Sequence, residues 1–554
     1  MSEHDDKVSI PARLELLSTV VTRMVKEDPV NLAIQSTRAL PAPVRKGIGT
    51  IARKLPDSTA KELASTLADV PVEIDGTNAV SEELKRITGV EPSITARPLT
   101  RARYEWNMGN VDRALSIAPI RSHLHAQLAD EWRLLTWDGP KLPKREPYVP
   151  EMDALHVLIN SAPHTNSGYT VRTRAILEGQ KAAGLDVAGV TRISYPVSIG
   201  KPFAKEADVV GGVTYHRLLP EKMPKLPVES ATLHAQMLAD LVSELRPRLL
   251  HATTNYANAI VTKAAAEAYG IPWVYEMRGQ LEKSWVARHP EAVQAQVEAS
   301  QRFIAMKNKE TAMAKAADAV VVLSEVQKLD LIERGVDEAK IKVIPNAYSP
   351  DPDAPKLSRA EAKASLGLEQ KFTVGTVTAV VDYEGLDTLV RAVKLLSDDG
   401  VDLRCVIVGD GVSLPGLREL VAELGIEDRV VMPGRVPREQ SHTWYQAIDL
   451  FAVPRKDTAV CRAITPIKPI EAMSTGAPIV ASDLPPLREL VIDPGSGLAC
   501  EPGNEADLAR VINRIISDGA LYDALSVAAR ANALDHTWEA NISRYLSLYS
   551  EVTS

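Results

Sequence analysis

The sequence predicts an α/β protein with two doubly wound domains that face a cleft and an extra helical region at the N-terminus. Three observations predict this. From about residue 151, short apolar segments alternate with segments of helical spacing. The alternation breaks at "NAYSPDPDAPKLS" and then starts again, and the first 150 residues lack strand patterns. Apolar strands separated by helices indicate parallel sheets that are buried on both faces.

The composition is that of a globular protein and argues against several other classes. The 554 residues are 45% hydrophobic and 25% charged, which is typical of several globular domains. The net charge of −8 argues against a nucleic-acid partner. The three cysteines are far apart and form no CxxC pair, and the first residues resemble no secretory signal. No apolar run is long enough to span a membrane, so we expect a cytoplasmic protein.

The first region, residues 1–150, is expected to be helical, and its sequence indicates no role. Within it, "VRKGIGTIARKLP" places apolar residues on one helical face with basic residues beside them. Such a face is typical of a helix at a membrane surface, so peripheral contact with the inner face of the membrane is one hypothesis. The alternative is a helix packed on its own domain. The apolar residues are Val44, Ile48, Ile51, Ala52 and Leu55, flanked by Arg45, Lys46, Arg53 and Lys54.

A proline-rich linker, "DGPKLPKREPYVPEMD", precedes the first α/β domain, which is expected at residues 151–350. Each apolar segment in it is bounded by turn residues or by a helical segment, which favours strands. The predicted strands are residues 154–160, 185–191, 208–218, 248–254, 272–277, 318–324 and 341–346.

The second α/β domain is expected at residues 351–530, followed by a C-terminal helix at 531–554 that packs back on the first domain. Two such domains in tandem suggest a cleft that can close, with ligands beyond the carboxyl ends of the strands. The predicted strands are residues 372–380, 403–411, 429–436, 449–455, 478–483 and 497–503.

The first predicted strand ends in a small polar loop, "NSAPHTNSGYT". Ser167 and Gly168 lie in it, directly before a helix that starts near Tyr169. Such a strand-to-helix turn favours an anion, although a tight turn that needs glycine explains the loop equally well. The sequence has no GxGxxG fingerprint, Walker loop, GxSxG elbow or HExxH motif. We therefore expect no metal and no cofactor.

The stretch "CRAITPIKPIEAM" carries two cations, Arg462 and Lys468, at the start of a short predicted helix. Arg455 and Lys456 stand at the end of the strand before it. A helix N-terminus already carries partial positive charge, so added cations favour an anion there. The sequence predicts an anion site, and the alternative is a solvated basic loop.

The run from "AIDLFAVPRK" to "EAMSTGAPIVASDLPPLRELV" resembles the donor-binding segment of the GT-B glycosyltransferases of family four, and the resemblance extends over about residues 153–550. It implies a nucleotide-sugar donor in the second domain and a saccharide or lipid-linked acceptor toward the first. It also implies retaining transfer without a metal. Glu471 resembles the glutamate that holds the donor ribose, which suits a carboxylate because it can accept two hydrogen bonds. Gly409 and Val436 are expected at the donor as well, Val436 near the base.

The sequence departs from the family pattern at three places. Ala463 stands where a glutamate is usual, Glu384 lies near the place of the clamp lysine, and Arg278 precedes Gly279 where a histidine is usual. A subset found among exopolysaccharide-assembly enzymes looks similar at all three, with "SGYTxRTRAI", "YExRG" and "RxxTPxKPxEAM". The resemblance to this subset implies a diphosphate clamp that has moved to Arg462 and Lys468.

Arg278 is expected on the acceptor side of the reaction centre, and the alternative is a structural ion pair with nearby Glu276 or Glu282. Two other functions stay open beside a transferase in cell-envelope or exopolysaccharide synthesis. One is a nucleotide-sugar epimerase, which needs acid and base groups that we cannot place. The other is a non-catalytic GT-B subunit that binds a partner through residues 1–150.

Overall fold

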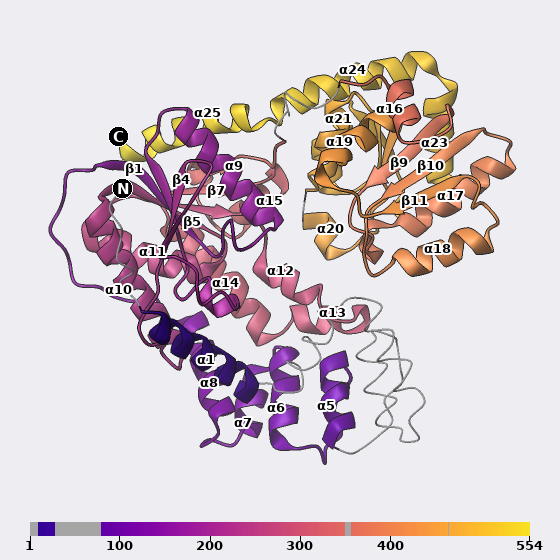
Figure 1. Cartoon of the computed structure of the whole chain (residues 1–554). Helices are drawn as coiled ribbons and strands as arrows, with labels where there is room; N and C mark the ends of the chain where they lie inside the picture. Colours follow the sequence, from indigo (N-terminus) through magenta and orange to yellow (C-terminus); the bar gives the residue numbers. More distant parts are fainter. Residues whose placement is uncertain (1–8, 28–78, 349–355, 464) are drawn as a thin grey trace. The chain divides into compact units, whose positions relative to one another are not determined.

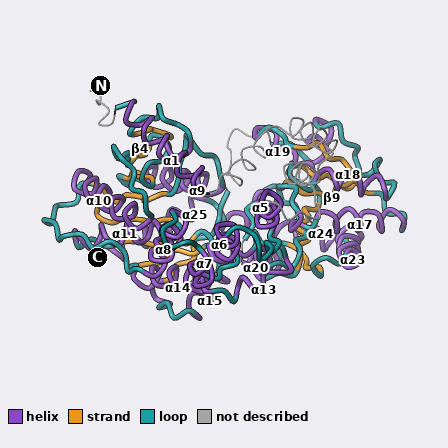
Figure 2. Tube along the Cα trace, turned by 90° about the horizontal axis from the view of Figure 1, so that it is seen from below, coloured by secondary structure: helices purple, strands orange, loops and turns teal. Residues whose placement is uncertain are grey.

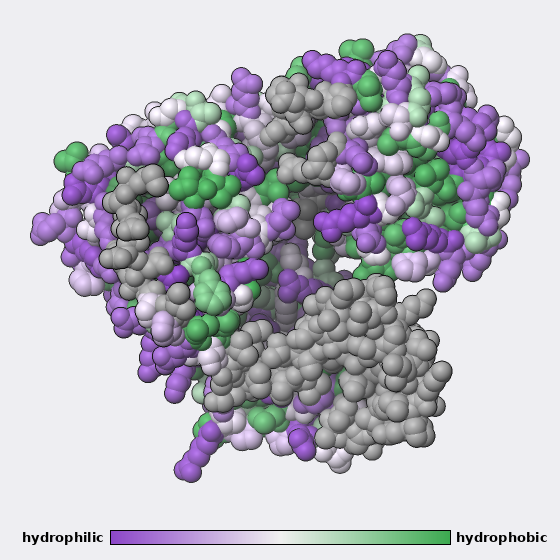
Figure 3. All heavy atoms as spheres, in the orientation of Figure 1, coloured by the Kyte–Doolittle hydropathy of each residue, from purple (hydrophilic) through white to green (hydrophobic). Residues whose placement is uncertain are grey.

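The computed structural model describes residues 9–27, 79–348, 356–463 and 465–554. The chain divides into two compact units near Val320, and each unit contains a parallel sheet flanked by helices (Figure 1, Figure 2). The amphipathic stretch 44–56 lies outside the described residues, so the membrane hypothesis stays a prediction. On the face seen in Figure 3, hydrophilic and apolar residues are interspersed. None of the described helices is long and apolar enough to cross a membrane.

The N-terminal region is helical where it is described, as predicted. Its small core contains Trp106, Val111 and Leu124. The Arg302 guanidinium, on a later helix, lies 4.6 Å from the centre of the Trp106 ring, which ties this region to the first α/β domain. The helices are α1 (Ile10–Glu27), α5 (Ala79–Thr88), α6 (Pro98–Asn107), α7 (Val111–Ile117) and α8 (His123–Thr136).

The first sheet has eight strands in the order β3-β4-β2-β1-β5-β6-β7-β8. Strands β1 and β2, β1 and β5, and β5 and β6 pair in parallel, so the strand order reverses at β1 and β5. The strands are β1 (Met152–Leu158), β2 (Val187–Thr191), β3 (Ala207–Val210), β4 (Val213–Arg217), β5 (Pro247–Thr253), β6 (Trp273–Met277), β7 (Ala319–Val322) and β8 (Ile341–Val343).

The prediction of one strand over residues 208–218 is wrong. The segment forms an antiparallel hairpin of β3 and β4 at the sheet edge. Gly211 and Gly212 have φ of 60° and 74°, and two consecutive residues with positive φ form the tight turn that joins hairpin strands. The helices that follow the strands of this sheet are α9 (Gly168–Ala182), α10 (Pro227–Leu245), α11 (Tyr256–Tyr269), α12 (Leu281–Val286), α13 (Glu291–Glu298), α14 (Gln301–Ala316) and α15 (Glu325–Glu333).

The second sheet is parallel throughout its paired strands and has the order β11-β10-β9-β12-β13-β14. This is the doubly wound order, and it reverses between β9 and β12. Apolar cores cover both faces. The strands are β9 (Phe372–Val377), β10 (Leu403–Val408), β11 (Val430–Gly434), β12 (Leu450–Val453), β13 (Ile479–Ser482) and β14 (Gly497–Cys500).

The helices of this unit include α25, which contacts the segment that follows β8. The Asn541 side-chain amide donates to the Pro345 carbonyl over 2.8 Å. The helices are α16 (Arg359–Ser365), α17 (Leu386–Asp398), α18 (Leu414–Glu423), α19 (Arg438–Ala447), α20 (Ala459–Ala463), α21 (Lys468–Ser474), α22 (Pro485–Leu487), α23 (Glu505–Ser517), α24 (Gly519–Asp535) and α25 (Trp538–Thr553).

Two buried histidines stack across the first sheet. His156 in β1 is in register with His251 in β5, and their ring centres are 4.4 Å apart. Burial lowers the pKa of both imidazoles, and His251 lowers the pKa of His156 further. Both rings are therefore neutral in the folded protein at pH 7.

We expect the free energy of unfolding to fall as the pH falls from 7.5 to 5.5. The unfolded chain protonates these histidines at a higher pH than the folded chain, so acid favours unfolding by up to about 1.4 kcal/mol for each ring over this interval. Urea unfolding at both pH values measures the loss. His156→Met should reduce the pH dependence, whereas His123→Met, at an exposed site on α8, should not. An equal pH dependence in both variants would contradict this account.

Candidate active site

The carboxyl ends of β9 and β12 meet at the point where the second sheet reverses its order. The loops after these strands approach each other closely at Gly385, which has a φ of +67°. A Cβ there would lie 1.8 Å from the Pro454 carbonyl oxygen, so a glycine is required. This is the edge at which doubly wound sheets bind ligands.

The two cations at the end of β12 already have carboxylate partners. Arg455 and Glu384 are buried, and they form a two-pronged pair with an Nη2–Oε1 distance of 2.7 Å. Lys456 Nζ lies 2.7 Å from Asp382 and 3.2 Å from Asp387. Glu384, which stands near the place of the family's lysine, thus serves as the counter-ion of Arg455. A direct donor contact by Arg455 stays a prediction.

Arg462 and Lys468 are the exposed cations of the cluster. Arg462 at the end of α20 pairs with Asp457, with Nη2 and Oδ2 2.6 Å apart. Lys468 at the start of α21 pairs with Glu471 over 3.0 Å. Their side chains are 55% and 46% exposed. Exposed pairs of this kind contribute about 0–1 kcal/mol, so an incoming anion can replace the carboxylates at little cost.

Glu471 is oriented by a neighbour that the sequence did not single out. The Tyr445 hydroxyl on α19 donates to Glu471 Oε2 over 2.6 Å. Burial, reinforced by this carboxylate, raises the pKa of Tyr445 well above its ordinary value, so the phenol stays protonated as the donor. The sequence interpretation missed Tyr445 because it lies 26 residues from Glu471 in the chain. It also missed Asp457, although this residue is a local partner five residues from Arg462.

Gly409 and Val436 follow β10 and β11 at the same edge of the sheet. Gly409 has a φ of +144°, and a Cβ would lie 1.8 Å from the Thr378 carbonyl oxygen. The close approach of the loops after β9 and β10 therefore explains this glycine. Val436 is partly buried against the apolar core. Donor contacts by these two residues stay predictions.

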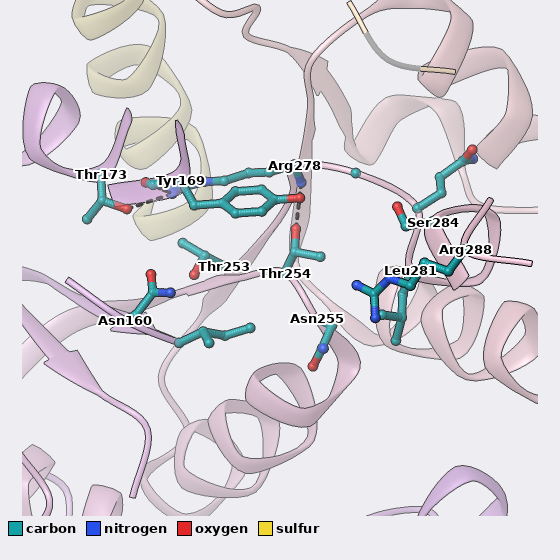
Figure 4. A pocket seen from close by; sticks show the side chains of 13 residues that line it. Asn160, Tyr169, Thr173, Thr253, Thr254, Asn255, Arg278, Leu281, Ser284 and Arg288 are labelled. Carbon is teal, nitrogen blue, oxygen red and sulfur yellow. Dashed lines mark hydrogen bonds between the residues drawn. The ribbon is translucent and has the colours of Figure 1, made fainter. Parts of the chain in front are cut away.

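The first unit has a cavity of about 290 Å³ at the carboxyl ends of β1, β5 and β6. It lies where the order of the first sheet reverses, which is again the expected ligand edge. Figure 4 shows the side chains that line it. Among them are Asn160, Tyr169, Thr254, Asn255, Arg278 and Arg288.

Arg278 is buried, and its guanidinium points away from the open part of this cavity (Figure 4). One terminal nitrogen donates to Thr173 Oγ1 over 2.6 Å and to the Tyr169 carbonyl over 2.9 Å. The other donates to Glu276 over 2.9 Å. The ion pair with Glu276, which was the alternative interpretation, is therefore present. Arg278 positions the start of α9, and its catalytic role stays a prediction.

Glu276 is the centre of a fully buried charge network. Besides Arg278, it accepts from Arg172 Nε over 2.7 Å and contacts His251 Nε2 at 3.0 Å. Burial alone would raise the pKa of the Glu276 carboxyl, but Arg278 and Arg172 hold it well below its ordinary value. The carboxylate is thus ionised and neutralised by buried cations.

Ser167 and Gly168 form the start of α9. The Ser167 hydroxyl accepts from the Thr170 amide, and the Thr170 hydroxyl accepts from the Ser167 amide over 2.7 Å, which is a capping box. No atom lies within 4 Å of a Cβ placed on Gly168, so space is open beside it. The cap and the open space are compatible with donor binding by these two residues, which stays a prediction.

Arg288 was missed by the sequence interpretation. It follows α12, and Figure 4 shows its guanidinium projecting into the cavity toward Asn255. No acidic side chain of the described ranges pairs with it. The described residues also contain no group of three or more His, Cys, Asp or Glu side chains that could hold a metal. The cavity therefore presents hydroxyl, amide and guanidinium groups.

Comparison with known proteins defines the class. Residues 358–532 match the family model "Glycosyl transferases group 1", and residues 167–347 match "Glycosyl transferase 4-like domain". The fold also resembles sucrose-phosphate synthase from Thermosynechococcus elongatus, with a TM-score of 0.56 and 22% identity over 72% of this chain and 99% of that chain. Anabaena HepE, solved with UDP, has a TM-score of 0.55 and 18% identity over 72% and 100% of the two chains.

Curated relatives are glycosyltransferases. The 2-deoxystreptamine glucosyltransferase of Streptomyces kanamyceticus is 29% identical over 38% of this chain and 54% of its own length. A D-inositol 3-phosphate glycosyltransferase of Xylanimonas cellulosilytica is 26% identical over 52% and 68%. The chain thus spans about half the length of the first of these relatives. The fold is that of the two-domain GT-B class, and two separate parts of the chain match the group 1 and 4-like glycosyltransferase models.

Proposed function

We propose that the protein transfers a sugar from a nucleotide-sugar donor to a saccharide or lipid-linked acceptor, with retention of anomeric configuration, in cell-envelope or exopolysaccharide synthesis. The observation that carries this is the cluster of Arg462, Lys468 and Glu471 within the group 1 domain. These residues lie on α20 and α21, in the connection that follows β12, the strand at which the second sheet reverses its order.

The roles follow from the contacts. Glu471, held by Tyr445, accepts hydrogen bonds from the ribose diol. When the donor binds, Arg462 and Lys468 leave their carboxylate partners and pair with the diphosphate. The negative charge of the diphosphate grows as the glycosidic bond breaks. Cations that are already positioned beside this charge stabilise the transition state and so lower the barrier to transfer. Because side chains supply the positive charge, we propose that the transfer needs no metal.

Thermal shift with a panel of UDP-, GDP- and TDP-sugars tests donor binding, and nucleotide release with product NMR tests the chemistry. HepE, which shares the fold, was solved with UDP and glucose, so UDP-glucose is the first member of the panel. We expect one donor to raise the melting temperature and to release nucleotide slowly, with the anomer retained and with no loss in EDTA. Inversion of the anomer, or isomerised donor without release, would contradict the proposal.

One observation favours a non-catalytic subunit as the second candidate. Each of the four cations between Arg455 and Lys468 has a carboxylate partner in the described structure, so the empty site is electrically balanced. Such a subunit would show no stabilisation by any nucleotide sugar in the panel.

A further inference from the structure

A second cavity, of about 510 Å³, adjoins the first and shares Ile159 and Asn255 with it. It lies beyond β2, between the starts of α10 and α11. Its apolar wall includes Leu134 of α8, so the N-terminal helical region helps to build it. Helix α1 packs Leu16 against Val197, which precedes the lining residue Ser198. The polar lining includes Arg192, Ser194, Ser198 and His234.

Arg192 is a cation without a counter-ion. No carboxylate in the described part of the chain pairs with its guanidinium, and its Nε is buried without a hydrogen bond. The guanidinium lies 5.9 Å from the centre of the Tyr195 ring. Burial lowers the pKa of Arg192, which records the cost of holding the charge there.

Arg217, on the neighbouring strand β4, shows how this fold satisfies a buried arginine. Its guanidinium contacts Asp208 over 2.8 Å, Ser161 over 2.7 Å and the Ala162 carbonyl over 3.1 Å. Among the described residues, Arg192 has no comparable set of hydrogen-bond and ion-pair partners. Arg192 is partly buried, and a charge held there without a partner among the described residues is costly to the fold alone, so a role in binding explains it better.

Two further polar groups in the cavity have no hydrogen-bond partner within the described residues. His234 is 5% exposed and its Nε2 is buried without a hydrogen bond, as is Ser198 Oγ. Burial, and then Arg192, lower the pKa of His234 to about 4, so the ring is neutral at pH 7. A neutral imidazole and a hydroxyl can each donate to an oxygen held by the guanidinium.

Nearby acidic groups are committed elsewhere. Asp130 accepts from the Val228 amide at the start of α10 over 2.8 Å. Glu310 accepts from the Tyr256 amide at the start of α11 over 2.9 Å. The helix starts are thus already capped, and the positive charge of the cavity comes from Arg192.

We propose that this cavity binds an anionic group, a carboxylate or a phosphate, on the saccharide acceptor. Arg192 pairs with the anion, and Ser198 and His234 complete its hydrogen bonds. Leu134, Ile193 and Val261 contact the C–H faces of the sugar. The acceptor continues into the first cavity past Ile159 and Asn255. The assignment of the ligand as an acceptor rests on the proposed function, whereas its charge rests on the cavity alone.

Isothermal titration of the full chain, without nucleotide, tests this with D-glucuronate and D-glucose 6-phosphate against neutral D-glucose. We expect at least one anionic sugar to bind tenfold or more tightly than glucose, and the two arms distinguish carboxylate from phosphate. Arg192→Met should reduce its affinity to that of glucose. His234→Phe, which keeps a ring, should weaken binding at least threefold. Arg248→Met, at an exposed position of β5, is the matched control and should not change it.

Stability gives an independent readout. Arg192→Met should melt at the wild-type temperature or above, because it removes a partly buried charge that has no counter-ion among the described residues, whereas Arg217→Met, which breaks a buried ion pair, should melt lower. Equal binding of all three sugars, unchanged affinity in Arg192→Met, or loss through Arg288→Met alone would overturn the proposal. Because no donor is present, these results are independent of nucleotide release, which tests the transferase activity.

Discussion

Lys468→Ala is expected to slow sugar transfer roughly a hundredfold, a loss of about 3 kcal/mol of transition-state stabilisation. The loss should appear in kcat as well as in donor binding, because the charge of the departing diphosphate peaks in the transition state. The fold should be unaffected, since Lys468 is 46% exposed and its pair with Glu471 is a surface pair. Nucleotide diphosphate should raise the melting temperature of wild type more than that of the variant.

Arg462→Ala is expected to behave in the same way, and the chain offers matched controls for both. Lys394 pairs with Asp398 on α17, and Arg510 pairs with Asp507 on α23 over 2.6 Å. Their alanine variants should transfer sugar at the wild-type rate. If Lys468→Ala and Arg462→Ala match these controls, the clamp does not lie on α20 and α21.

The loop after β9 needs a different interpretation from the one that the sequence favours. Glu384 stands near the place of the family's lysine, and on that ground its removal is expected to have little effect. The structure shows instead that Glu384 is the buried counter-ion of Arg455. Glu384→Ala would remove the carboxylate that forms a two-pronged pair with a buried guanidinium, so it is expected to destabilise the second unit and cannot serve as a neutral control.

Glu276→Gln is expected to lower the free energy of unfolding by about 3–5 kcal/mol. The substitution keeps the shape of the side chain but removes a buried carboxylate that pairs with both Arg172 and Arg278. Both guanidiniums would then be desolvated beside an amide, which is a poor substitute for a charge. Urea unfolding monitored by circular dichroism measures the loss.

Glu267→Gln on α11 is the matched control. Glu267 is 57% exposed and pairs with Lys263 one turn away, so its loss should change stability by about 0–1 kcal/mol. Similar unfolding curves for the two variants would show that water enters the Glu276 network and screens it. In that case the Arg278–Glu276 pair would contribute little to stability, and the acceptor-side role that the sequence position of Arg278 suggests would be favoured.

The sequence by itself determined the two parallel sheets, because buried strands and helices each leave a local periodic pattern. It also located the exposed cations Arg462 and Lys468, since a charge at a helix start is visible in the local order of residues. The glycine pair Gly211 and Gly212 was also a local signal, in this case for a turn. The β3–β4 hairpin was missed nevertheless, because the apolar residues on both sides of the pair were interpreted as one strand.

Only the tertiary structure decided how charges from distant segments pair. Glu384 and Arg455 come from loops after different strands, and they meet because β9 and β12 are neighbours in the sheet. Arg192 and His234 line one cavity although they come from the end of β2 and from α10. Whether a buried cation has a counter-ion depends on which strand ends lie side by side, and that order is set by the packing of the whole sheet. Local spacing therefore predicts the elements, and the pairing of charges between distant segments follows only from the fold.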